Sequence, residues 1–312
     1  MTLATTLDPM TQLLGIVPSM NTPFLDDGRI DFDGVERAVD AVIDAGVAGM
    51  LILAVAAETG SLDLGEKHAV AGATLRRVAG RVPVIMGCSA AQQADRVALA
   101  AMARALGAPA MLCQAPQGLG GAALVEAMQE IAEAGPPVLM LQDLDFAGPG
   151  LPLEDILRLR EQVPSFRCLK IEVTLPGPKY SAVLEATGGT LHVSGGWAAS
   201  QMMEALHRGV HAFIPTAMDA VYVAIHRLFT TGRHAEARAL HGRLAPILAF
   251  SNQHLDVSIR FFKHLRQREG LFASARCRAG VRPLDAHQMR ELEACIDQVL
   301  ALQQAVRAHG RV

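Results

Sequence analysis

Apolar residues in this chain form short continuous runs instead of alternating with polar ones. Runs of strand length cover residues 15–20, 49–55, 82–89, 110–115, 138–143, 166–173, 190–195 and 212–217. A continuous run is typical of a parallel strand that is covered on both faces. The pattern therefore predicts a buried parallel sheet.

Segments with the period of an amphipathic helix separate these runs. They cover residues 33–45, 64–78, 92–106, 121–134, 153–162, 178–186 and 200–208. Successive runs lie about 20–35 residues apart, which is the size of a strand–crossover–strand unit. A series of eight such units predicts an α/β fold, a (β/α)8 TIM barrel. An open doubly wound sheet is the alternative, but no glycine-rich dinucleotide fingerprint follows the first run.

The chain continues well beyond the last run. Further helical segments cover residues 220–229, 234–250, 257–269 and 286–308. A barrel needs only one helix after its eighth strand. We therefore predict a barrel core over residues 1–220. Residues 221–312 would hold the last barrel helix and a helical C-terminal extension packed on the barrel.

Composition and charge narrow the class of protein. Of the 312 residues 51% are hydrophobic, and the formal net charge of −3 argues against nucleic acid or a membrane surface as a partner. The five scattered cysteines lack a CxxC pair, which is typical of reduced thiols in a cytoplasmic protein. Residues 1–12 lack the regions of a secretory signal, and the longest apolar run, 46–57, is too short to span a bilayer.

Lysine is rare in this chain, and one lysine lies in a predicted strand. The lysines are Lys67, Lys170, Lys179 and Lys263, and Lys170 belongs to the run 166–173. Burial of a lysine is costly unless the amine is paired or neutral, and a neutral amine is a nucleophile toward carbonyls. The alternative is a lysine that extends from the strand end into solvent.

Polar residues gather where the predicted strands end, which is where a barrel carries its active site. Residues two apart on a strand share a face, so Glu172 points the same way as Lys170. Its carboxylate would hold the amine protonated and could act as an acid or base once an imine has formed. A buried ion pair without chemistry is the alternative. For Glu58, after the second run, the alternative is a helix cap or an acceptor of backbone N–H groups.

Other catalytic signatures are missing from the sequence. The histidines show no HxH or HExxH spacing, and there is no GxSxG, P-loop or EF-hand pattern. We therefore predict neither a metal site nor a cofactor.

Several segments match the pattern of one enzyme family. They are Gly15-Ile16-Val17-Pro18 with Asn21-Thr22-Pro23-Phe24, the segment 54–62 with Glu58 at a Gly-Thr-Thr-Gly-Glu motif, the strand 83–87, Gly232 with Ala235, Glu236 and Ala237, and Lys170 at the position of a Schiff-base lysine. On these residues the chain resembles the dihydrodipicolinate synthase / N-acetylneuraminate lyase family along almost its full length.

The resemblance implies a fold, a chemistry and an assembly. The family consists of (β/α)8 barrels with extra C-terminal helices, usually tetramers, and we expect a homo-oligomer, a tetramer or dimer. Members bind pyruvate or another 2-oxo acid as an imine on the lysine, and the derived enamine adds to an aldehyde or the reverse reaction cleaves a carbon–carbon bond. Some relatives dehydrate sugar acids. We predict Lys170 and Glu172 as catalytic residues. The predicted substrate-binding residues are Ala56, Glu58, Thr59, Gln142, Asp143, Gly195 and Phe213.

This chain departs from the family pattern at the hydroxyl groups. The two threonines of the family motif fall on Val55 and Ala56, the strand-five tyrosine on Leu141, the tyrosine pair after strand four near Gln117-Gly118, and the arginine for the second substrate on Phe146. The acidic residue after the lysine falls on Ile171, with Glu172 next. The Thr–Tyr–Tyr proton relay is therefore missing, and Gln142, Asp143 and Glu172 are left to replace it.

The sequence thus predicts a class I aldolase or lyase that forms a Schiff base between Lys170 and pyruvate or another 2-oxo acid. Glu172 or Asp143 would move protons, and Gln142 and Thr59 would orient the oxo acid. The second substrate would be an aldehyde. The alternatives are a sugar-acid (2-keto-3-deoxy) aldolase or dehydratase, an aromatic-aldehyde lyase, and a non-catalytic barrel that binds a 2-oxo acid.

Overall fold

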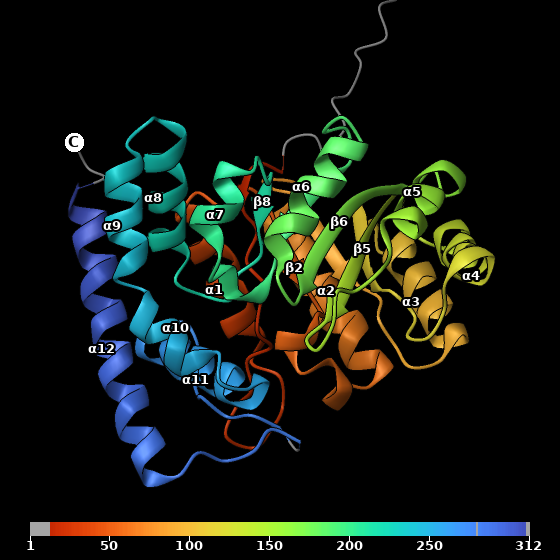
Figure 1. The fold of residues 1–312 in the computed structure, drawn as a ribbon. Helices are drawn as coiled ribbons and strands as arrows, with labels where there is room; N and C mark the ends of the chain where they lie inside the picture. Colours follow the sequence, from red (N-terminus) through yellow and green to blue (C-terminus); the bar gives the residue numbers. More distant parts are fainter. Residues whose placement is uncertain (1–12, 279, 310–312) are drawn as a thin grey trace, which may run out of the picture.

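The computed structural model describes residues 13–278 and 280–309 (Figure 1). The prediction that residues 1–12 hold no secretory signal lies outside this range. The described chain forms an eight-stranded parallel sheet in the order β1-β8-β7-β6-β5-β4-β3-β2. The strands are β1 (Gly15–Ile16), β2 (Met50–Ile52), β3 (Val84–Gly87), β4 (Ala110–Gln114), β5 (Val138–Asp145), β6 (Phe166–Val173), β7 (His192–Gly195) and β8 (Ala212–Phe213).

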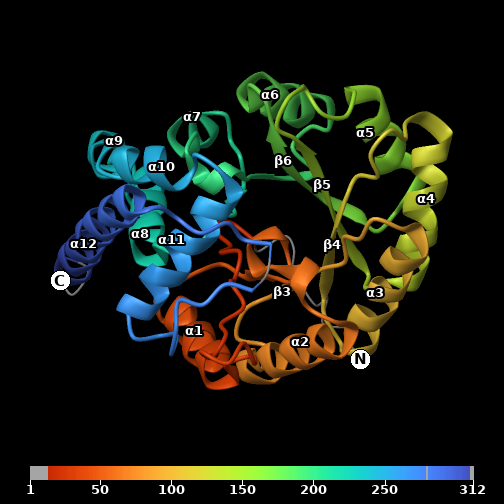
Figure 2. The same cartoon turned by 90° about the horizontal axis from the view of Figure 1, so that it is seen from below.

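Backbone contacts join the first strand to the second and close the sheet on itself. The Leu51 N–H donates to Pro18 O at 2.9 Å, and the Met20 N–H donates to Leu51 O at 2.8 Å. Helices surround the strands, as Figure 2 shows in the view from below. The predicted TIM barrel is confirmed.

The barrel helices follow the strands in sequence. They are α1 (Phe32–Asp44), α2 (Leu64–Val78), α3 (Gln93–Ala105), α4 (Gly121–Ala134), α5 (Leu153–Gln162), α6 (Pro176–Ala186), α7 (Met202–His207) and α8 (Asp219–Thr230). Side chains fix where two of them begin. The Asp31 carboxylate accepts from the Gly34 N–H at the start of α1, and Asp63 forms a capping box with Glu66 at the start of α2.

Two hydrophobic clusters lie on opposite sides of the strands. One is built mainly of strand residues, among them Leu51, Ile85 and Met140, and it fills the inside of the barrel. The other joins alternate strand residues to apolar residues of the helices and lies outside the barrel. Residues inside the barrel above the first cluster therefore face its mouth.

The C-terminal part holds α9 (His234–Gly242), α10 (Ala245–Ser251), α11 (Leu255–Arg268) and α12 (Ala286–His309). The prediction of one helix over 234–250 is wrong, because the helix is interrupted at Arg243 and Leu244. Pro246 lies in the first turn of α10, as its second residue, and a proline inside a continuous helix would lose a hydrogen bond and clash with the preceding turn. The long helix α12, seen at the left in Figure 1, packs against α8, α10 and α11.

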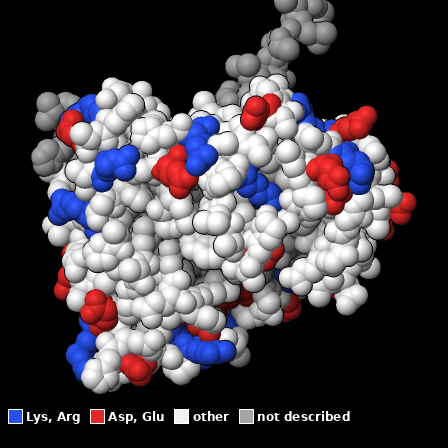
Figure 3. Space-filling view, viewed as in Figure 1, with Lys and Arg blue, Asp and Glu red and all other residues white. Residues whose placement is uncertain are grey.

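Charged side chains lie in small mixed groups on the face seen in Figure 3, separated by uncharged surface. This distribution fits the small net charge of the chain. No helix in the described ranges is both long enough and apolar enough to cross a membrane.

Candidate active site

An ion pair between Lys170 and Glu172 lies at the mouth of the barrel. Both residues belong to β6, two positions apart, and their side chains point to the same side. Lys170 Nζ lies 2.8 Å from Glu172 Oε2, with 7% and 11% of the two side chains exposed. The strand period thus places an amine and a carboxylate in direct contact, almost out of water.

The Glu172 carboxylate is held by two further hydrogen bonds. The Trp197 N–H donates to Oε1 at 2.9 Å, and Gln142 Nε2 donates to Oε2. Burial acts to raise the pKa of Glu172, but the Lys170 ammonium and these donors outweigh it and hold the pKa below its usual range. The carboxylate is therefore ionised in the free protein.

Gly196 allows the loop after β7 to approach this carboxylate. A Cβ atom at position 196 would lie only 2.1 Å from Glu172 Cγ and 2.2 Å from its carboxylate. Any side chain at this position would displace Glu172 or the Trp197 N–H, so the hydrogen bond depends on glycine.

Gln142 on β5 is the direct neighbour of Lys170 across the sheet. It faces the inside of the barrel, whereas Leu141 packs in the outer cluster. The resemblance put the family's strand-five tyrosine on Leu141, a position that faces away from the cavity, whereas the residue beside Lys170 is Gln142. Gln142 Oε1 is buried without a hydrogen-bond partner in the described chain.

A cavity of 540 Å³ opens above the ion pair. Its walls are mostly apolar and include Ala56, Leu144, Phe146 and Trp197. The Phe146 and Trp197 rings meet edge to face with centroids 4.5 Å apart, and Phe146 is 60% exposed at the rim. The amine of Lys170 is thus accessible from a pocket with an aromatic edge.

A second cavity of 870 Å³ adjoins the first at the ends of β2, β3 and β4. Both cavities are lined by Ala54, Val55, Gln142 and Leu255. The lining of the second cavity is more polar, with Thr59, Ser61, Ser89, Arg96, Gln114 and Gln117 among its residues. The mouth of the barrel therefore has an apolar part beside Lys170 and a polar part beyond Gln142.

The structure brings some predicted site residues together and separates others. Ala56 lines the Lys170 cavity, Thr59 and Glu58 line the second, and Gln142 lines both. Asp143, Gly195 and Phe213 line neither cavity.

These three residues lie on the outer side of their strands because each follows an inward-facing neighbour. Asp143 pairs with Lys179 and accepts the Leu151 N–H at 2.9 Å. A Cβ at Gly195 would meet Tyr180 and Phe213, which are both buried in the outer cluster.

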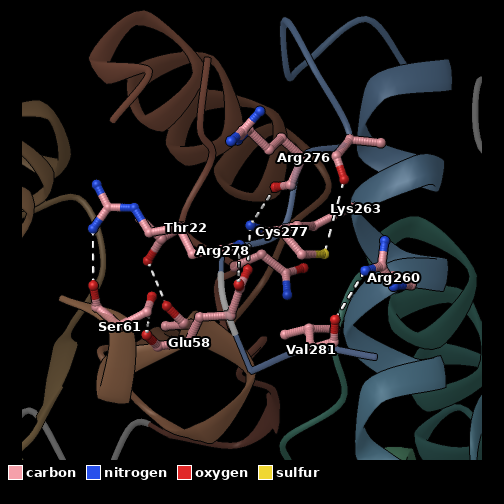
Figure 4. A network of polar contacts seen from close by, with 12 residues as sticks. Thr22, Glu58, Ser61, Arg260, Lys263, Arg276, Cys277, Arg278 and Val281 are labelled. Carbon is pink, nitrogen blue, oxygen red and sulfur yellow. Dashed lines mark hydrogen bonds and ion pairs between the residues drawn. The ribbon is translucent and has the colours of Figure 1, made fainter. Parts of the chain in front are cut away.

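Glu58 belongs to a separate buried network that Figure 4 shows. Its carboxylate pairs with Lys263 of α11 and accepts the Arg278 N–H at 2.8 Å. Lys263 also donates to Arg276 O at 2.9 Å and lies 4.0 Å from the centroid of the Phe24 ring. Burial lowers the pKa of Lys263, against the opposing effect of Glu58. Lys263 lines neither cavity, although it is fully buried.

Sequence reasoning missed Trp197 and Arg96. Trp197 is the single tryptophan of the chain and follows the seventh predicted strand, which was an available signal. Arg96 lies in the first turn of α3, and its place in the cavity depends on how the helix packs. Within the described residues, no group of three or more His, Cys, Asp or Glu side chains is placed to hold a metal ion.

The fold and the site together define a TIM-barrel protein with a lysine–carboxylate pair at the carboxyl end of its sixth strand. The chain belongs to the dihydrodipicolinate synthetase family, whose profile matches residues 12–299. The resemblance drawn from the sequence is thereby confirmed. The family comprises lyases and aldolases.

Individual relatives carry different activities. The chain is 28% identical over 291 residues to an L-2-keto-3-deoxyarabonate dehydratase of Azospirillum brasilense, covering 90% of this chain and 92% of that protein. It is 27% identical over 242 residues to a 4-hydroxy-tetrahydrodipicolinate synthase of Xanthomonas campestris, covering 76% and 80%. The fold matches the 4-hydroxy-tetrahydrodipicolinate synthase of Methylacidiphilum fumariolicum SolV with a TM-score of 0.82 at 21% identity, covering 95% and 98%.

Proposed function

We propose that this protein is a lyase or aldolase that binds pyruvate or another 2-oxo acid as a Schiff base on Lys170. The observation that carries the proposal is the buried contact of 2.8 Å between Lys170 Nζ and Glu172 Oε2 beneath an open cavity. Membership of a lyase and aldolase family supports it. The synthase relatives and the dehydratase relative differ in the reactions that their names state, so the family alone does not fix the second substrate.

Glu172 is placed to carry the proton that imine formation requires. The ammonium of Lys170 passes one proton to the Glu172 carboxylate, and the neutral amine attacks the C2 carbonyl of the oxo acid. Glu172 returns the proton to the hydroxyl group of the carbinolamine, water leaves, and a protonated imine remains. Ammonium and ketone have then become iminium and water, and Glu172 is again ionised.

The same carboxylate is placed to act in the next step. The iminium nitrogen withdraws electrons, so a proton leaves C3 to Glu172 and an enamine forms. In an aldol addition, the enamine attacks an aldehyde carbonyl and the protonated Glu172 supplies the proton for the alkoxide. Gln142 donates to Glu172 and orients it during both transfers.

A dehydration is the second candidate reaction, and the dehydratase relative, which aligns over 90% of this chain, favours it. The enamine would expel a hydroxyl group from the carbon next to C3, and Glu172 would protonate the leaving group as water. A sugar acid with a 2-keto-3-deoxy group has the hydroxyl at this position. We also propose that the protein is cytoplasmic and forms a homo-oligomer. Light scattering of the purified protein tests the oligomeric state.

The proposal is tested by trapping the imine. The protein is incubated with pyruvate, reduced with borohydride, and mapped by peptide mass spectrometry. We expect a stable adduct on Lys170 and none in Lys170→Arg, which keeps the charge and the fold but cannot form the imine. Lys263 is an internal control, because it is equally buried and paired but lines no cavity.

The result separates the enzyme from a binding protein. Retention of the adduct in Lys170→Arg would refute the assignment of the nucleophile. An absence of adducts with pyruvate and with a panel of other 2-oxo acids would refute Schiff-base chemistry. Thermal stabilisation by pyruvate without an adduct would then identify a barrel that only binds the oxo acid.

A further inference from the structure

The polar cavity beyond Gln142 contains a cation that the proposed chemistry does not use. Arg96 Nε is buried and has no hydrogen-bond partner within the described residues. Its Nη1 reaches Gln93 Oε1 at 3.4 Å, which is long for a hydrogen bond. Arg96 lines the polar cavity. Apart from the long contact to Gln93, its guanidinium has no hydrogen-bond partner among the described residues, so it can bind an acceptor in the cavity.

The carboxylates that line the same cavity are engaged elsewhere. Glu58 is paired with Lys263, and Asp256 lies 3.4 Å from His254 Nδ1 and 3.5 Å from Arg282 Nε. Among the described residues no carboxylate forms an ion pair with Arg96. The other polar groups of the lining are neutral hydroxyls and amides. The cavity therefore has one positive charge without a counter-ion.

The two cavities are placed to hold the two ends of one molecule. Gln142 lines both of them and is the neighbour of Lys170 across the sheet. A carbon chain attached to Lys170 through its 2-oxo group can extend past Gln142 into the polar cavity. Its far end then meets Arg96.

We infer that the polar cavity binds an acidic group, a carboxylate or a phosphate, at the far end of the substrate chain, with Arg96 as its counter-ion. The inference rests on the proposed function for the end attached to Lys170. The planar guanidinium suits both anions because it can donate two parallel hydrogen bonds to either. Arg96 is thus a specificity-determining residue for the part of the substrate beyond C3.

The test compares two 2-oxo acids of equal chain length, 2-oxoadipate and 2-oxohexanoate, which differ only in the carboxylate at the far end. The quantity measured is the concentration for half-maximal borohydride trapping on Lys170. We expect 2-oxoadipate to be trapped at a concentration about 10- to 100-fold lower, the range that one charge-assisted hydrogen-bond pair supplies. Arg96→Gln should remove this preference, so that the two oxo acids are trapped at similar concentrations.

Two control variants test whether the preference depends on the guanidinium at position 96 or only on the positive charge of the protein. Arg96→Lys should keep part of the preference, because it keeps the charge but loses the planar fork. Arg238→Gln, which removes a charge from the exposed face of α9, should change nothing. A preference that persists in Arg96→Gln, or that is missing from the wild type, would overturn the inference.

A second measurement decides the inference if no oxo acid is trapped and the proposed function fails. Calorimetry then measures the binding of adipate and of inorganic phosphate to the wild type and to Arg96→Gln. Binding that the substitution abolishes supports the anion site, and the better ligand tells carboxylate from phosphate. Equal binding by both proteins, or binding by neither, overturns it.

Discussion

At the scale of single residues, the Glu172 carboxylate is the group on which the site converges. It receives the Lys170 ammonium, the Gln142 amide and the Trp197 N–H, so three elements of the barrel position one side chain. Val55 and Ala56, the positions to which the resemblance assigns the two threonines of the family motif, line the cavity wall. If the proposed function holds, we expect proton transfer to depend on a carboxylate that already contacts the amine.

The variant Glu172→Gln tests this role. It keeps the size of the side chain and an acceptor for Trp197, but it cannot accept a proton. We expect the exchange of the C3 protons of pyruvate for deuterium, followed by NMR, to slow by about 10²- to 10⁴-fold.

Asp143→Asn is the matched control, since sequence analysis left Asp143 as the other candidate. Its carboxylate lies on the outer side of β5 against Lys179, so we expect it to change the exchange rate by only a few-fold. The opposite result, with exchange lost in Asp143→Asn and kept in Glu172→Gln, would reverse the assignment.

At the scale of elements, the segment after α11 holds the loop that follows β2. Arg278 donates to Gly28 O, Ser61 O and both oxygens of Glu66, and its N–H donates to Glu58. The loop between β2 and α2 forms part of both cavity walls through Val55. The C-terminal extension therefore helps to hold one wall of both cavities.

Lys263→Met tests the strength of this connection. The substitution leaves the Glu58 carboxylate buried without its counter-ion, so we expect the free energy of unfolding in urea to fall by about 3–5 kcal/mol. Adding Glu58→Gln should restore part of the loss, because the two residues are coupled. As a control, Lys67→Met on the partly exposed face of α2 should change the free energy of unfolding by less than about 0.5 kcal/mol. A double variant that loses the sum of the two single effects would show that the pair is not coupled.

The positions of the strands and helices were largely predictable from the sequence. Which strand residues point into the barrel was not. Apolar runs and helical periods are local properties, so the sequence located the strands and helices, except at the break before Pro246. Run 138–143 is apolar on both faces, so no alternation marks which residues point inward. The sequence therefore does not show that Gln142, and not Leu141, is the neighbour of Lys170 across the sheet. Arg96 and Lys263 gain their roles only from tertiary contacts, which no local pattern encodes.

At the scale of the whole molecule, a histidine at the start of β7 contacts the segment that precedes β1. His192 Nε2 lies 2.7 Å from Leu13 O, and its ring stacks on His211 at 5.0 Å between centroids. Burial lowers the pKa of His192 to about 4, and Nδ1 is buried without a hydrogen-bond partner in the described chain. The folded barrel thus requires this ring to be neutral.

The stability of the barrel should consequently depend on pH. The unfolded chain takes up a proton on His192 near pH 6.5, whereas the folded chain does so only near pH 4, so acid favours unfolding between these values. We expect the free energy of unfolding to be highest above pH 6.5 and to fall toward pH 4, with His192 contributing about 3 kcal/mol at most.

Urea unfolding of the wild type and of His192→Gln at a series of pH values checks this dependence. Gln can keep the hydrogen bond to Leu13 O but does not titrate, so the variant should show a shallower fall. Burial also lowers the pKa of His211, His226, His241 and His264, which leaves a residual slope of the same sign. Identical slopes in both proteins would exclude His192 as the source of the pH dependence.

The close approach at Gly196 has a consequence for how this sequence can change over time. While Glu172 keeps its place, no side chain fits at position 196, because its first carbon would overlap the carboxylate. A lineage could acquire a larger residue there only if the glutamate moved away from its present position or was itself replaced. A descendant with a side chain at position 196 has therefore lost the present contact between this carboxylate and the Trp197 N–H.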